Sequence, residues 1–184
     1  MNKTWIPNAV TSVRLVGALA ILFLPVPSAA FFTVYTLCGL SDVVDGSIAR
    51  LLHAESDFGA KLDSVADLTF YAVMLIRLLP ELVEALPSWI WLAVAAVLML
   101  RLCAYLVAAL RYHRFAAMHT YLNKLTGFCV FLMPYFLGHG ALTVYCMVVC
   151  GIGSLASLEE FIIHAYSPTY NANRKSIFWK KQEA

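Results

Sequence analysis

Six stretches of this chain are each long and apolar enough to cross a lipid bilayer, which takes about 20 residues of helix. Breaks rich in proline, glycine or polar residues separate them, at 25–27, 53–57, 80–88, 113–119 and 138–140. Hydrophobic residues make up 61% of the 184, more than a water-soluble domain of this size covers. The predicted spans are 8–24, 29–52, 58–79, 89–111, 122–137 and 141–165.

We therefore expect an all-α integral membrane protein with six transmembrane helices, forming one domain over residues 1–184. The first stretch begins with Asn8, Thr11 and Arg14, which is too polar for a cleaved signal, so it is counted as a span. The formal net charge of +2 is too small to suggest nucleic acid as a partner.

The basic residues predict how the chain is oriented. The loops on one side carry Glu81 and Glu84, with Arg77 as the nearby base. The positive-inside rule then places both termini and the loop around His53 in the cytoplasm. We expect a protein of the cytoplasmic membrane. The basic residues on the predicted cytoplasmic side are Lys3, Arg50, Lys61, Arg111, Arg114, Lys124, Arg174, Lys175, Lys180 and Lys181.

Four aspartates lie in two pairs on the second and third spans. Asp42 and Asp45 are three residues apart and Asp63 and Asp67 are four apart, so each pair projects from one helix face. A turn near Ala54 brings the two pairs to the same depth on antiparallel helices. Carboxylates gathered in apolar surroundings repel one another, so a cation must neutralise them or some must stay protonated. The pattern favours a divalent-metal site.

The segment around these acids reads Asp42-x-x-Asp45-Gly46-x-x-Ala49-Arg50, eight residues, then Gly59-x-x-x-Asp63-x-x-x-Asp67. It resembles, at every defined position, the signature of the CDP-alcohol phosphotransferase family of membrane phospholipid synthases. The resemblance implies two Mg²⁺ or Mn²⁺ ions held by the four aspartates, with Asp67 also acting as the general base on the acceptor hydroxyl.

The small residues near the acids have two interpretations. Gly46, Ala49 and Gly59 lack bulk, which lets a CDP-linked lipid approach the backbone closely. Tight helix packing in the membrane also favours small residues. Arg50 either pairs with a carboxylate or the nucleotide phosphate, or extends to the membrane interface. We assign these four residues to CDP-lipid binding.

Other resemblances bear on the acceptor alcohol. Pro7-Asn8-x-x-Thr11-x-x-Arg14 is similar to the start of many bacterial phosphatidylglycerophosphate synthases, whereas Asp63-Ser-x-Ala-Asp67 also occurs in phosphatidylserine synthases. Glycerol-3-phosphate is the first choice, and serine or an inositol-type acceptor is the alternative. The same signature also serves enzymes whose donor is a CDP-linked small alcohol.

Arg101 lies halfway along the fourth span, where an unpaired arginine costs at least about 2.5–3.5 kcal/mol. It should face the interior with an anionic partner, either a structural one such as the aspartates or a phosphate on the acceptor. Arg111 and Lys124 add positive charge nearby in the sequence, so we predict that these three residues bind the acceptor phosphate. Glu159 and Glu160 are interpreted as supporting groups or as partners of Arg174 or Lys175.

The sequence thus predicts a metal-dependent enzyme of phospholipid synthesis that transfers a phosphatidyl group from CDP-diacylglycerol to a small alcohol and releases CMP. The resemblance also implies a homodimer. The alternative from another class is a cation- or proton-coupled transporter, because aspartates inside a membrane commonly mark ion pathways. The small residues around the acids and the short chain argue against it.

Overall fold

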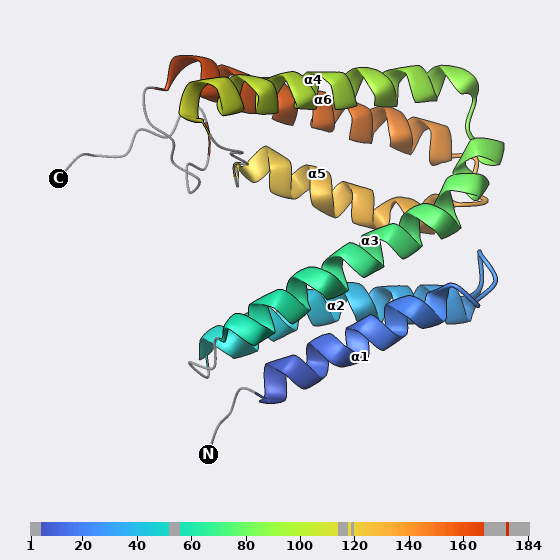
Figure 1. Ribbon diagram of the computed structural model, residues 1–184. Helices are drawn as coiled ribbons and strands as arrows, with labels where there is room; N and C mark the ends of the chain where they lie inside the picture. The colour runs from blue at the N-terminus through green and yellow to red at the C-terminus, as the bar shows by residue number, and fades with distance from the viewer. Residues whose placement is uncertain (1–4, 52–55, 114–117, 119, 168–175, 177–184) are drawn as a thin grey trace. The chain divides into compact units, whose positions relative to one another are not determined.

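The computed structural model describes residues 5–51, 56–113, 118, 120–167 and 176, with the backbone alone at Ile6, Val43 and 45–51. These residues form six α-helices and one short 3₁₀-helix (Figure 1). The protein is therefore all-α over the described part of the chain. The elements are α1 (Trp5–Ile21), α2 (Ala29–Leu51), α3 (Asp57–Ala85), α4 (Ser88–Tyr112), α5 (Tyr121–Leu132), η1 (Met133–Phe136) and α6 (Leu142–Tyr166).

Two of the described helices, α4 and α6, are clearly long and apolar enough to cross a membrane. On α4, large apolar side chains point outward from the protein in a stripe that includes Leu92, Leu106 and Leu110, each more than half exposed. Such a stripe is unfavourable in water and is typical of a helix that faces lipid.

Two prolines affect the helices differently. The break predicted at 80–88 lies at 86–87, later than its predicted start, because α3 continues through Pro80 to Ala85. Leu78 and Leu82 are buried on either side of Pro80, and this packing offsets the one backbone hydrogen bond that a proline removes. The predicted fifth span is a continuous helix only to Leu132. Pro134 cannot donate to the carbonyl four residues earlier, and the chain there tightens into η1.

Polar caps begin three of the helices. The hydroxyl oxygen of Ser28 accepts a hydrogen bond from the amide of Phe31, 3.1 Å away, at the start of α2. Ser56 does the same for Gly59 at the start of α3, at 3.0 Å, and Thr120 caps α5. These side chains satisfy amides that a helix leaves without a partner at its first turn.

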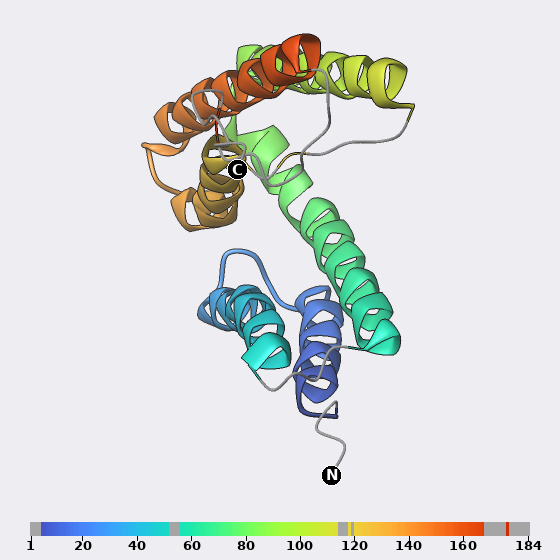
Figure 2. The ribbon, with the colours of Figure 1, turned by 90° about the vertical axis from the view of Figure 1, so that its left-hand side faces the viewer.

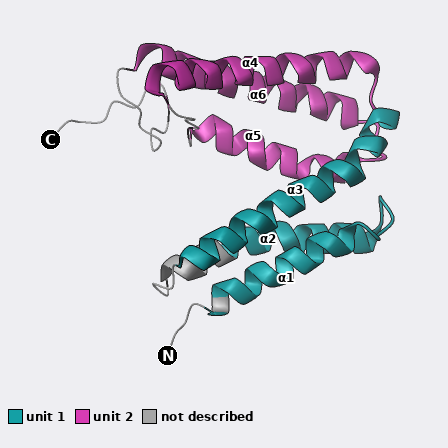
Figure 3. Ribbon diagram, in the orientation of Figure 1, with its two compact units in different colours: residues 1–85 teal, residues 86–184 magenta. Residues whose placement is uncertain are grey.

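The chain divides into two compact units, residues 1–85 and 86–184 (Figure 3). In the first unit α1 packs against both α2 and α3 (Figure 2). Phe31 and Tyr35 of α2 stack on each other, and Tyr35 stacks on Phe70 of α3 with ring centroids 5.6 Å apart. The Tyr35–Phe70 contact joins α2 and α3, the two helices that carry the aspartates, and α1 packs against both.

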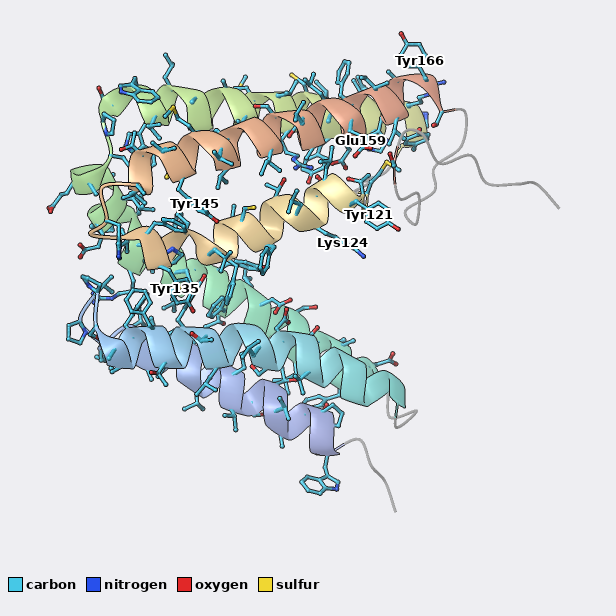
Figure 4. All side chains as sticks on the ribbon, turned by 180° about the vertical axis from the view of Figure 1, so that it is seen from behind. Tyr121, Lys124, Tyr135, Tyr145, Glu159 and Tyr166 are labelled. Atoms are coloured by element: carbon cyan, nitrogen blue, oxygen red, sulfur yellow. The ribbon has the colours of Figure 1, made fainter. Side chains whose placement is uncertain are left out.

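In the second unit α4 and α5 both pack on α6. Small residues make the approach of α4 to α6 close: Ala104 and Ala108 are fully buried on α4, and a Cβ on Gly153 of α6 would lie 3.2 Å from Val97. Tyr145 of α6 points toward α5 and donates a hydrogen bond of 2.7 Å to the carbonyl of Cys129 (Figure 4). Small-residue packing and the half-buried Tyr145–Cys129 hydrogen bond thus hold the helices of this unit together.

Candidate active site

Three of the four predicted acids come together in the first unit. Asp42 near the C-terminal part of α2 and Asp63 and Asp67 in the first half of α3 each offer a carboxylate oxygen within 4.8 Å of the others. Their side chains are 50%, 47% and 42% exposed, so one side of the cluster is open to a ligand. Oxygen donors at this spacing suit a hard divalent cation such as Mg²⁺ or Mn²⁺.

The other predicted residues of this region lie in the last turns of α2. The backbone of Asp45, Gly46, Ala49 and Arg50 is helical. Their side chains lie outside the described residues.

Arg14 of α1 binds all three described acids. Its Nη1 contacts Oδ1 of Asp42, and its Nη2 lies 2.6 Å from Oδ1 of Asp63 and 3.2 Å from Oδ1 of Asp67. The Arg14 side chain is only 1% exposed, so the guanidinium lies on the buried side of the carboxylates. A buried arginine with several carboxylate partners offsets part of their mutual repulsion.

The sequence patterns did not predict this role of Arg14, which contributed only to the family resemblance and to the polarity of the first span. The signal was present, because an arginine within an apolar helix needs an anionic partner. The sequence alone does not say which acids lie opposite it.

Close packing places Arg14. A Cβ on Gly17, one turn further along α1, would lie 2.8 Å from the sulfur of Cys38 on α2, so α1 and α2 approach closely there. The carbonyl of Arg14 lies 3.7 Å from the same sulfur. One turn earlier, the buried hydroxyl of Thr11 donates to the carbonyl of Pro7 at 3.0 Å. The Thr11 and Arg14 of the Pro-Asn-x-x-Thr-x-x-Arg pattern are thus both buried on α1.

Gly59 has a visible packing role. A Cβ at this position would lie 2.8 Å from Oδ1 of Asn8 and 3.0 Å from the hydroxyl oxygen of Ser56. The absence of a side chain therefore lets α1 approach the first turn of α3. This contact supports the packing interpretation, and nucleotide binding by Gly59 stays a prediction.

The second unit holds another polar cluster, centred on Glu160 of α6. Nη1 of Arg101 lies 2.5 Å from Oε2 of Glu160 and 2.9 Å from Oδ1 of Asn123. Nδ2 of Asn123 also donates to Oε2, at 3.1 Å. The prediction that Arg101 has an anionic partner is confirmed, and the partner is Glu160. This pairing was missed because Arg101 and Glu160 are 59 residues apart in the sequence.

Glu160 is fully buried and uses both carboxylate oxygens. Oε1 accepts from the backbone amide of Met118 at 3.0 Å and lies 3.6 Å from Nε2 of His164. The carboxylate therefore joins α4, α5, α6 and the segment before α5. Arg174 and Lys175, the partners proposed from the sequence, lie outside the described residues.

The other two predicted acceptor residues lie at the ends of their helices. Arg111, in the last turn of α4, donates from Nη1 to the carbonyl of Ala165 near the end of α6. Lys124 is exposed in the first turn of α5, and its side chain extends away from the helix (Figure 4). Both lie in the same unit as Arg101.

Comparison with known proteins decides the family. Residues 4–158 match the family described as CDP-alcohol phosphatidyltransferase. The chain belongs to this family. It is also similar to a protein of Cereibacter sphaeroides named CDP-diacylglycerol--glycerol-3-phosphate 3-phosphatidyltransferase, with 40% identity over 77 residues. That match covers 39% of this chain and 35% of the length of the relative. No solved structure matches the chain.

Proposed function

We propose that this CDP-alcohol phosphatidyltransferase family member transfers a phosphatidyl group from CDP-diacylglycerol to glycerol-3-phosphate and releases CMP. The observation that carries the proposal is the meeting of Asp42, Asp63 and Asp67 within 4.8 Å, at positions of the family signature. The name of the Cereibacter sphaeroides relative supports glycerol-3-phosphate over serine or an inositol-type acceptor.

Asp42, Asp45, Asp63 and Asp67 are the proposed ligands of two Mg²⁺ or Mn²⁺ ions. The half-exposed carboxylates fit such ions because both prefer oxygen ligands. Bound divalent ions would neutralise the pyrophosphate of the CDP-lipid and the charge that develops on the leaving phosphate. The acids supply the negative charge and the fixed positions that this chemistry needs.

Asp67 is the proposed general base. Its carboxylate takes the proton of the acceptor hydroxyl, whose oxygen bonds to the phosphorus that carries the diacylglycerol. The bond from that phosphorus to the bridging oxygen breaks, and CMP leaves with the bonding electrons. A general base needs to lie within hydrogen-bond reach of the hydroxyl, which the partial exposure of Asp67 permits.

We assign the CDP-lipid to the surface formed by Gly46, Ala49, Arg50 and Gly59, near the acids in the sequence. Here a small side chain lets the nucleotide approach a helix backbone, and Arg50 pairs with a phosphate. The donor is CDP-diacylglycerol in this proposal, and a CDP-linked small alcohol is the alternative donor.

The acceptor phosphate is assigned to Arg101, Arg111 and Lys124. In the described residues, both hydrogen bonds of Arg101 come from Nη1, which leaves its second terminal nitrogen as the donor for a phosphate oxygen. Arginine binds phosphate through such paired donors. Arg101→Ala should raise the KM for glycerol-3-phosphate much more than that for CDP-diacylglycerol.

We also propose six transmembrane spans with both termini and the active site on the cytoplasmic side, and a homodimer. The family membership, the apolar helices α4 and α6 and the distribution of basic residues support this arrangement. Labelling of single cysteines introduced at the termini of the chain in sealed vesicles would test the orientation.

The activity test uses the purified protein with Mg²⁺ or Mn²⁺ and CDP-diacylglycerol. Glycerol-3-phosphate, serine and inositol phosphate are offered in turn, and the lipid product is identified by mass. We expect phosphatidylglycerophosphate and stoichiometric CMP. Good use of serine with no use of phosphorylated alcohols would refute the acceptor assignment. Absence of CMP release with every acceptor would refute phosphatidyl transfer and favour the transporter.

A further inference from the structure

Arg14 is far more buried than the three acids that it contacts. Its side chain is 1% exposed, whereas those of Asp42, Asp63 and Asp67 are 42–50% exposed. The guanidinium therefore contacts the acids from the interior, and their outer side is open. The three contacts each use one oxygen of a carboxylate, Oδ1 in every case.

We infer that Arg14 is a positioning residue that holds the metal-binding carboxylates in place from the buried side. The exposed side of the three half-exposed carboxylates stays available to a divalent ion. This inference rests on the metal centre proposed above, and it concerns how this chain prepares that centre.

The geometry favours this role over competition between Arg14 and the metal. A competing guanidinium would lie on the open side, where an ion enters, but Arg14 is buried among α1, α2 and α3. Its planar fork of donors spans α2 and α3 at once, binding Asp42 through one terminal nitrogen and Asp63 and Asp67 through the other. Without this cation, three carboxylates within 4.8 Å repel one another and move apart.

Two substitutions of Arg14 separate the effect of its charge from the effect of its geometry. Lysine would keep the positive charge, but its compact ammonium group cannot contact acids on two helices with the same geometry. Glutamine removes the charge. The series of arginine, lysine and glutamine therefore separates the positioning of the acids from their charge balance.

The test measures Mn²⁺ binding to the full-length protein in detergent, from the electron paramagnetic resonance signal of free Mn²⁺. Partners that orient metal ligands typically contribute about 10–100-fold to metal affinity, so Arg14→Gln should weaken Mn²⁺ binding by that factor. Arg14→Lys should fall between Arg14→Gln and the wild type. Unchanged or tighter binding by Arg14→Gln would overturn the inference.

Arg77→Gln is the matched control. Arg77 is also an arginine on a helix of the first unit, and its Nη2 donates to the carbonyl of Leu24 at 2.5 Å. It lies ten residues after Asp67 on α3, about 15 Å along the helix. Arg77→Gln should leave Mn²⁺ affinity unchanged even if it lowers thermal stability. An equal loss of affinity in this control would mean that Arg14 acts only through general stability, which also overturns the inference.

The outcomes separate this inference from the proposed function. If the wild type shows no saturable Mn²⁺ binding, the metal centre itself fails and the inference fails with it. If the wild type binds Mn²⁺ and Asp63→Asn does not, but both Arg14 variants bind like the wild type, only the role of Arg14 is wrong. Should Arg14→Gln fail to fold, Arg14→Lys decides alone, and binding equal to the wild type counts against the inference.

Discussion

Replacing Glu160 by glutamine changes one charge in the polar cluster of the second unit and leaves the shape of the side chain almost the same. Glu160 is fully buried, and its two carboxylate oxygens accept hydrogen bonds from three donors. The amide of glutamine has one acceptor oxygen and one donor nitrogen. In either orientation, an NH₂ group faces a donor that the carboxylate had satisfied.

The contacts of Glu160 set how much unfolding free energy Glu160→Gln should lose. If the glutamine oxygen faces Arg101 and Asn123, the backbone amide of Met118 loses its acceptor. If the glutamine amide is flipped, Arg101 and Asn123 lose the carboxylate oxygen to which both donate. An unsatisfied buried group costs about 1–3 kcal/mol. Removing one partner of a buried ion pair costs about 3–5 kcal/mol. Because Arg101 is 21% exposed and recovers some hydration, we expect about 2–4 kcal/mol in total.

The assay is thermal unfolding in detergent, followed by circular dichroism. For a chain of this length each kcal/mol corresponds to about 2–4 °C, so the Tm of Glu160→Gln should fall by about 5–15 °C. Glu84→Gln makes the same chemical change at an exposed position of α3. Its free energy of unfolding should stay within about 0.5 kcal/mol of the wild-type value.

The same variant tests the acceptor assignment. The carboxylate of Glu160 holds Nη1 of Arg101 in place. Glu160→Gln should therefore raise the KM for glycerol-3-phosphate more than the KM for CDP-diacylglycerol. A fall in Tm that corresponds to less than about 1 kcal/mol of unfolding free energy would refute the argument that Glu160 is a buried partner of three donors. A large fall in Tm with both KM values unchanged would instead leave Glu160 a structural residue and remove Arg101 from the acceptor site.

Three further predictions concern the first unit. Asp67→Asn should lower kcat by about 10²–10⁴-fold with a smaller effect on CDP-diacylglycerol binding, and near-normal turnover would exclude Asp67 as the base. Excess EDTA should abolish activity and Mg²⁺ or Mn²⁺ should restore it, whereas activity that persists in EDTA contradicts the metal mechanism. Gly17→Ala should lower the Tm, because its Cβ would lie 2.8 Å from the sulfur of Cys38, which is buried between α1 and α2; the control is Gly151→Ala, where a Cβ meets nothing within 4 Å. An unchanged Tm for Gly17→Ala would contradict the close packing of α1 on α2.

Much of the local structure followed from the sequence. The apolar stretches and the polar or proline-containing breaks between them predicted the approximate positions of all six described helices. The spacing of Asp42, Asp63 and Asp67 predicted that they would meet, and they do. Helical periodicity places Asp63 and Asp67 on one face of α3, and the three acids meet around Arg14 of α1, which packs against both α2 and α3.

The tertiary structure decided which charged groups pair. Arg14 is 28 residues from Asp42 and 49 from Asp63, and Arg101 is 59 from Glu160. The sequence shows that a buried arginine needs an anionic partner, but several acids satisfy that requirement equally well. The rotation and depth at which helices pack select the partner, and small residues such as Gly17 and Gly153 set how closely those helices approach. The continuation of α3 through Pro80 has the same cause, because the packing of Leu78 and Leu82 outweighs a local preference to end the helix.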